Sequence, residues 1–200
     1  LFLSVSRFAS AAASEGAFGE VVYLWGLVVR RTSIVLFLLL LGVGAISSYL
    51  ASFLKIDDPW LIIALGFAFS AAAILSINEG LLQGLERFAG LSGSNILAPF
   101  SKLLLGVAFI IVGMDVLGGL LAMTIGCVVA ISFGIWALRD LLGIPRTKVS
   151  LQGFLAFSRL AFVTGLLWVI LISMDIILVK HYLDGSEAGD YSAVAVLGRI

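Results

Sequence analysis

The chain has 200 residues, of which 62% are hydrophobic and 12% are charged, with twelve basic and twelve acidic side chains. A soluble domain is about half apolar and about a quarter charged, so this composition excludes an ordinary water-soluble domain and favours a protein embedded in a lipid bilayer. The balanced charge gives no indication of a nucleic-acid partner. The single cysteine, Cys127, excludes a disulfide within the chain.

Five stretches are long and apolar enough to cross the membrane as helices. A helix needs about 20 mostly apolar residues to cross about 30 Å of hydrocarbon. The stretches are too long for strands and lack the alternation of a transmembrane barrel. The predicted fold class is therefore all-α, a polytopic transmembrane helical bundle. In chain order, the predicted spans are residues 32–54, 59–78, 96–114, 117–138 and 157–179.

Both ends of the sequence are expected to lie inside a longer protein. Residue 1 is a leucine that opens an apolar stretch without the basic start of a signal peptide. Residues 191–200 form another apolar stretch, which we interpret as the beginning of a sixth crossing. We therefore expect an internal segment with partial spans at both ends.

The segments between the spans also carry structural signals. Residues 16–31 are predicted to form a helical lead-in to the first span, with Tyr23 and Trp25 at the headgroup level. Residues 79–88 have an amphipathic pattern that indicates a helix along the membrane surface, and the glycine-rich residues 90–95 are expected to end it. A tight turn is predicted at residues 115–119. Small residues at four-residue spacing, Gly80 and Gly84, predict a close approach of another helix.

The distribution of basic residues predicts the orientation in the membrane. The segments on one side, 1–31, 79–95 and 139–156, hold seven basic residues, and the other side holds Lys55 and Lys180. Cytoplasmic segments carry an excess of Lys and Arg, so we place the first set in the cytoplasm and residues 181–190 in an outer loop. The seven are Arg7, Arg30, Arg31, Arg87, Arg139, Arg146 and Lys148.

The sequence contains no group of reactive side chains that would predict catalysis. We therefore expect that the protein is not an enzyme and has no catalytic residue, metal site or cofactor. His181 has no second histidine or cysteine near it in sequence. Asp57 and Asp58 precede Pro59, where aspartate favours a turn or a helix cap. Cys127 is interpreted as a core residue, and no glycine-rich phosphate loop occurs in the sequence.

The candidate functional residues are charges inside the apolar spans. Such charges are costly and usually face a water-filled cavity or a partner. Lys102 either lines a cavity or extends its ammonium to the membrane edge. Arg159 lies near the start of the last full span, and Asp175 near its end is either interfacial or paired with a base on another helix. Arg199 is a further basic candidate.

Several segments resemble one transporter family. Residues 81–88 (LLQGLERF) resemble the polysaccharide biosynthesis, or oligosaccharide flippase (Wzx-type), family of the multidrug/oligosaccharidyl-lipid/polysaccharide exporter superfamily. The most specific resemblance is residues 174–200, which contain MDIILVKHYL, EAGDY and VLGRI. They are similar to the family's seventh helix, outer loop and start of the eighth helix. Residues 6–8 (SRF) resemble the end of its second helix.

The resemblance implies a transporter with two six-helix lobes that alternates between inward-open and outward-open states. Residues 1–148 would be the end of the second to the sixth helix of the N-terminal lobe, and residues 149–200 would begin the C-terminal lobe. The implied substrate is a polyprenyl-pyrophosphate-linked oligosaccharide, flipped across the cytoplasmic (inner) membrane for cell-surface polysaccharide synthesis.

The resemblance also implies roles for the membrane charges. Lys102, Arg159 and Arg199 would face the pyrophosphate in the cavity, and Asp175 or Glu79 would bind a coupling ion. Two other functions stay open. An ion-coupled multidrug exporter of the same superfamily would have a less basic, more acidic or aromatic cavity. A membrane glycan polymerase or ligase would need a large outer loop with several Arg and His residues.

Overall fold

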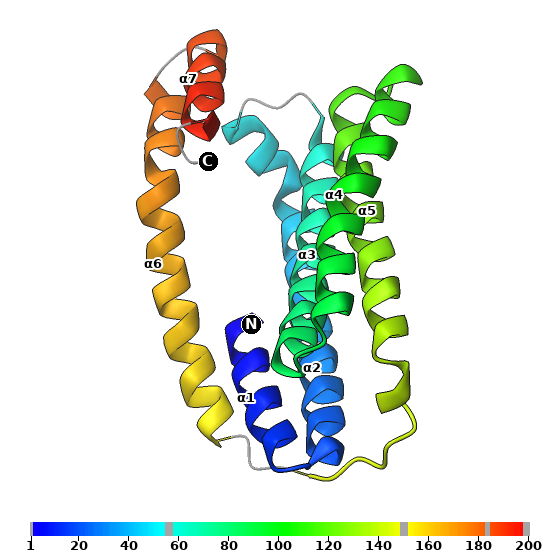
Figure 1. The fold of residues 1–200 in the computed structure, drawn as a ribbon. Coiled ribbons are helices and arrows are strands. Elements are labelled where there is room, and N and C mark those ends of the chain that lie inside the picture. The colour runs from blue at the N-terminus through cyan, green and yellow to red at the C-terminus, as the bar shows by residue number, and fades with distance from the viewer. Residues whose placement is uncertain (1, 55–57, 149–151, 183–184, 198–200) are drawn as a thin grey trace. The chain divides into compact units, whose positions relative to one another are not determined.

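The protein is a helical membrane bundle (Figure 1). The computed structural model describes residues 2–54, 58–148, 152–182 and 185–197, and this part contains no strand. Helices α2 to α6 are long and apolar enough to span a membrane, which confirms the predicted fold class. The elements are α1 (Phe2–Ser14), α2 (Phe18–Phe53), α3 (Pro59–Gly84), α4 (Phe88–Ile111), α5 (Asp115–Ala137), the short 3-10 helix η1 (Arg139–Leu141), α6 (Gln152–Tyr182) and α7 (Gly185–Leu197).

The internal contacts divide the chain into two compact units, with the boundary after Phe154. The first unit contains α1 to α5 and the beginning of α6. The second contains the rest of α6 and α7. The lobe boundary between residues 148 and 149 stays a prediction.

The start of α3 shows how the sequence sets a helix boundary. Pro59 occupies the first turn, where its missing N–H leaves no hydrogen bond unmade. The Asp58 side chain accepts a hydrogen bond from the backbone N–H of Trp60 at 2.9 Å. The capping role predicted for this aspartate pair is therefore confirmed for Asp58, whereas Asp57 lies outside the described residues.

The connection between α3 and α4 differs from the prediction. Residues 79–84 continue α3 instead of forming a surface helix, and Leu81 and Leu82 are fully buried. The turn is made by residues 85–87, with Glu86 at a φ of 57°, and residues 90–95 are helical. Burial of the two leucines favours this arrangement, because apolar side chains gain more in a core than at an interface. The predicted surface helix and its glycine-rich end were wrong.

Two other boundaries are also shifted. The turn between α4 and α5 lies at residues 112–114, where Gly113 has a φ of 86°, and Asp115 is the first residue of α5. The predicted outer loop 181–190 is largely helical in the described residues, since α6 ends at Tyr182 and α7 begins at Gly185. Glu187 lies in the first turn of α7, where a negative charge stabilises the helix N-terminus.

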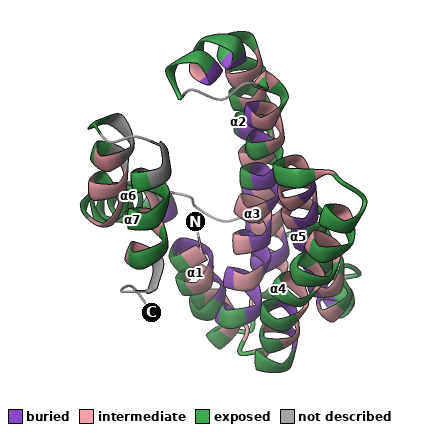
Figure 2. Cartoon of the chain, turned by 90° about the horizontal axis from the view of Figure 1, so that it is seen from above, coloured by how far each residue is buried: buried purple, intermediate pink, exposed green. Residues whose placement is uncertain are grey.

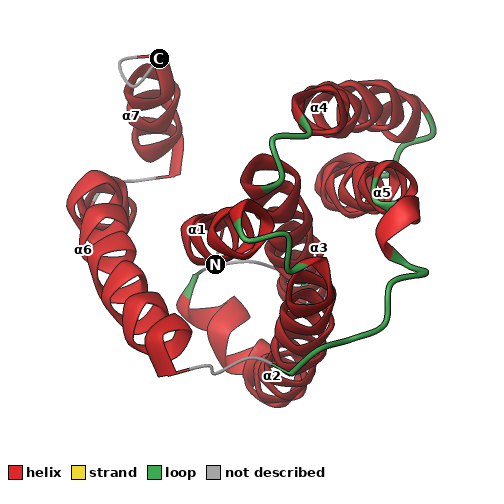
Figure 3. Cartoon of the chain, turned by 60° about the horizontal axis from the view of Figure 1, so that its bottom comes forward, coloured by secondary structure: helices red, strands yellow, loops and turns green. Residues whose placement is uncertain are grey.

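The main core of the first unit lies at one end of its helices. The α1–α2 link, the α3–α4 turn and η1 all lie at this end (Figures 1 and 3). In Figure 2 the buried residues line the inner faces of α1, α2, α3 and α5. The same end carries the segments that the charge bias places in the cytoplasm, and this orientation stays a prediction. The core comprises Val5, Ala9, Val21, Val22, Leu24, Val28, Ile77, Leu81, Leu82, Leu138, Leu141 and Phe154.

Helix α1 packs directly against two glycines of α3. A Cβ atom on Gly80 would lie 2.6 Å from the carbonyl oxygen of Phe2, and one on Gly84 would overlap the carbonyl oxygen of Ser6. The two glycines are four residues apart and therefore share a face of α3. The predicted helix contact at this pair is confirmed, and its partner is α1.

Candidate functional site

Lys102 lies near the middle of α4 and lines an open groove of about 370 Å³. Pro99, Leu103, Gly106, Val107 and Ile110 follow the same face of α4, and Gly119 of α5 completes the wall. Among these described lining residues Lys102 alone is charged. The groove is therefore an apolar stripe with a single ammonium, built by residues that repeat at helical spacing.

A proline in α4 and a glycine in α5 lie close to the backbone of Lys102. Pro99 lies one turn before it inside α4, where a proline removes a backbone hydrogen bond. Gly126 of α5 faces it from the neighbouring helix. A Cβ atom on Gly126 would lie 2.9 Å from the carbonyl oxygen of Ala98 and 3.2 Å from the backbone nitrogen of Lys102. This close helix contact holds the Lys102 backbone in place, while the side chain stays exposed.

Glu79 occupies a half-buried position in α3, next to the buried Asn78. It makes no ion pair with Lys102 in the described part of the chain. Cys127 of α5 packs with Ala71, Leu75 and Ala130, so its predicted role in the core is confirmed.

The remaining predicted site residues belong to the second unit. Asp175 of α6 is half-buried and accepts a hydrogen bond from the Tyr191 hydroxyl of α7 at 3.0 Å. Arg159 is exposed on α6. Arg199 lies outside the described residues. The roles predicted for Lys102, Glu79, Arg159, Asp175 and Arg199 stay predictions.

Sequence reasoning missed a buried polar contact in the main core. The indole nitrogen of Trp25 donates a hydrogen bond to the Asn78 side-chain oxygen at 3.0 Å, and Asn78 is 2% exposed. Trp25 is half-buried and packs against the main core, and its position at the headgroup level stays a prediction. An apolar environment favours this arrangement, because a buried amide needs a hydrogen-bond partner.

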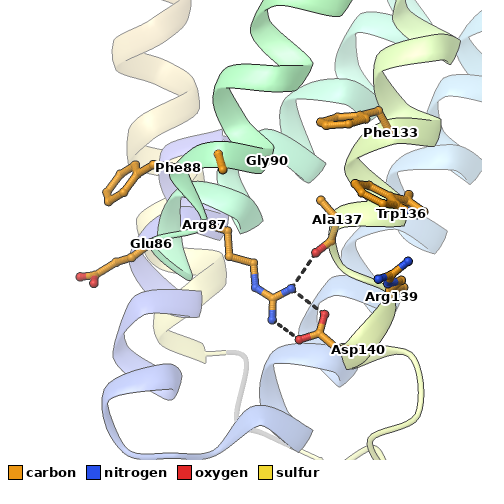
Figure 4. Close-up of a pocket in the computed structure, with 10 residues that line it drawn as sticks. Glu86, Arg87, Phe88, Gly90, Phe133, Trp136, Ala137, Arg139 and Asp140 are labelled. Atoms are coloured by element: carbon orange, nitrogen blue, oxygen red, sulfur yellow. Dashed lines mark hydrogen bonds and ion pairs between the residues drawn. The ribbon is translucent and has the colours of Figure 1, made fainter.

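Sequence reasoning also missed an ion pair outside the spans. The Arg87 guanidinium donates to both carboxylate oxygens of Asp140, one of them at 2.6 Å, and to the carbonyl oxygen of Ala137 at 2.7 Å (Figure 4). These bonds tie the α3–α4 turn to the end of α5. Hydrogen bonding from Arg87 lowers the pKa of the Asp140 carboxyl from 3.8 to about 2. No local pattern relates two residues separated by 53 positions.

The ion pair makes stability depend on pH in acid. Because its folded-state pKa is depressed, the Asp140 carboxylate stabilises the fold above its ordinary pKa of 3.8, and this contribution fades as the pH falls towards about 2. The Asp140 side chain is 60% exposed, so we expect Asp140→Asn to cost only about 0.2–1 kcal/mol at pH 7. Thermal melts of both proteins in detergent should converge between pH 5 and pH 2. A constant difference over that range would contradict a contribution from the charge.

Comparisons with known proteins add no assignment: no family model, no curated protein and no solved structure matches the chain.

Proposed function

We propose that this chain is part of a membrane transporter that flips a polyprenyl-pyrophosphate-linked oligosaccharide across the cytoplasmic membrane. The observation that carries the proposal is the groove beside Lys102, an apolar stripe of about 370 Å³ with one ammonium in mid-helix. Such a substrate has a long hydrocarbon chain next to a strongly negative pyrophosphate. A surface that combines an apolar stripe with a single cation complements both parts.

The position of Lys102 along α4 supports a role in a cavity. It lies about 21 Å from the first residue of α4 and about 14 Å from the last, at 1.5 Å per residue. A lysine that served only to reach the headgroups would lie nearer to one end of its helix. A cation at this depth is costly in lipid, so its presence favours a wet cavity or an anionic ligand.

The other charges receive roles that follow from the same proposal. Arg159 is exposed on α6 and, with Arg199, would offer a further cation to the pyrophosphate. Asp175 or the half-buried Glu79 would bind the coupling ion. The half-buried carboxylate of Glu79 also favours a second candidate function, an ion-coupled multidrug exporter. Such an exporter needs a carboxylate in the membrane but does not require Lys102.

Glycan export by the full-length protein tests the proposal. Lys102→Ala and Lys102→Gln should each lower export by about tenfold or more, because a charge-assisted hydrogen bond is lost. Lys102→Arg should retain more activity, since it keeps the charge. Lys148→Ala, an exposed lysine outside the spans, is the matched control and should export normally.

The outcomes also separate the alternatives. Export is normalised to the amount of protein in the membrane, so that a folding defect is not read as a transport defect. Full export by both Lys102→Ala and Arg159→Ala would remove the basic-cavity mechanism from this segment. Drug resistance that is lost in Glu79→Gln but kept in Lys102→Ala would favour the multidrug exporter.

A further inference from the structure

A second pocket, of about 690 Å³, lies where α4 begins and α5 ends and shares no lining residue with the Lys102 groove (Figure 4). Its walls come from the α3–α4 turn, the first residues of α4, the end of α5 and η1. Because α4 begins at Phe88 and α5 ends at Ala137, the pocket lies where the membrane spans end. This is the level at which lipid headgroups meet a membrane protein.

One wall of the pocket is aromatic and carries a cation. The Arg139 guanidinium lies over the Trp136 ring, 5.0 Å from its centroid. Phe133 packs against Trp136 with the ring centroids 5.6 Å apart. Trp136 is 57% exposed, and Phe88, another lining residue, is 59% exposed. An exposed indole beside an arginine combines an apolar contact with a positive charge.

The charges around the pocket leave Arg139 as the available cation. Arg87 is neutralised by its ion pair with Asp140, and Glu86 points away from the others in Figure 4. Arg139 also acts electrostatically on Asp140, but the hydrogen bonds to that carboxylate come from Arg87, and the described residues show no hydrogen bond from the Arg139 side chain. Its N–H donors therefore remain free to bind a phosphate oxygen.

We propose that this pocket binds the headgroup of an anionic glycerophospholipid, with Arg139 contacting the phosphate and Trp136 packing against the glycerol and upper acyl chains. The volume of about 690 Å³ accommodates more than a free phosphate ion. The exposed aromatic side chains favour a ligand whose apolar part adjoins its charge. The lining is not basic overall, since Glu86 and Asp140 balance Arg87 and Arg139, so the proposal rests on Arg139 alone as the cation that contacts the headgroup, a contact that basic residues make at the ends of membrane helices.

Lipid binding to the purified full-length protein tests this proposal. Phosphatidylglycerol and phosphatidylcholine are titrated separately in detergent, and the bound lipid is measured by native mass spectrometry. We expect Arg139→Gln to weaken phosphatidylglycerol binding by about fivefold, as for one basic residue near a membrane surface. Trp136→Leu should weaken it as well. Arg30→Gln, a matched exposed arginine on α2, should bind like the unchanged protein.

Three results would overturn the proposal. The first is an equal loss in Arg139→Gln and Arg30→Gln, since bulk charge would then explain the binding. The second is equal binding of phosphatidylglycerol and phosphatidylcholine. The third is displacement of the lipid by millimolar inorganic phosphate with the same dependence on Arg139, which would indicate a site for a free anion. Circular dichroism of each variant verifies that it is folded. Glycan export is not part of the readout, so this test is independent of the transport function.

Discussion

Gly84→Leu is expected to lower the melting temperature of the detergent-solubilised protein by about 6–12 °C, corresponding to about 3 kcal/mol for a bundle of this size. The reason is the contact between α3 and α1. A Cβ atom on Gly84 would overlap the Ser6 carbonyl oxygen and lie 2.9 Å from the Ala9 Cβ. The first of these neighbours is backbone, so it cannot move away without a shift of the whole helix α1.

A second glycine provides the control for this prediction. Among the described residues, no neighbouring atom lies within 4 Å of where a Cβ atom on Gly42 of α2 would be, so Gly42→Leu adds the same side chain without a clash. We expect it to be neutral or slightly stabilising, because glycine is a poor helix former. Gly84→Ala should fall between the two. Fluorescence-detected size-exclusion chromatography after heating measures all three. Equal melting temperatures for Gly84→Leu and Gly42→Leu would contradict the tight α1–α3 contact.

The second large effect is expected at the Trp25–Asn78 hydrogen bond. Asn78→Ala removes the acceptor and leaves the indole N–H of Trp25 without a partner in the core. An unsatisfied buried donor costs about 1–3 kcal/mol, and Asn78 is 2% exposed. Ser76→Ala on the same helix is the control. In the described part of the chain its hydroxyl donates to the Ala73 carbonyl oxygen of its own helix and to no other group, so its loss should be close to neutral.

A double-mutant cycle separates the hydrogen bond from the lost volume. In the Trp25→Phe background no donor is left unpaired, so Asn78→Ala should cost less there than in the unchanged protein. Thermal melts of the four proteins give the coupling. Equal costs in both backgrounds would show that the buried amide stabilises the fold through packing and not through this hydrogen bond.

The spans could be predicted from the sequence because a membrane helix is a local property. Its length and apolar composition are set by about 20 consecutive residues, and all of its backbone hydrogen bonds are internal. Asp58 and Pro59 predicted the start of α3 for the same reason, since a cap involves only neighbouring residues. The candidate residue Lys102 was found because a charge in an apolar stretch is visible without any knowledge of packing.

Turns and contacts depended on the tertiary structure. The amphipathic pattern of residues 79–88 is the same for a surface helix and for the end of a buried one. Only the contacts with α1 and α2 show that residues 81 and 82 belong to the core. The pairs Arg87–Asp140 and Trp25–Asn78 each join residues 53 positions apart, and helical periodicity contains no information about the register of neighbouring helices. Thus the apolar spans, their number and the membrane environment followed from the sequence by itself. Which helix contacts which, and which polar groups become partners, was decided by side-chain packing between segments distant in the chain.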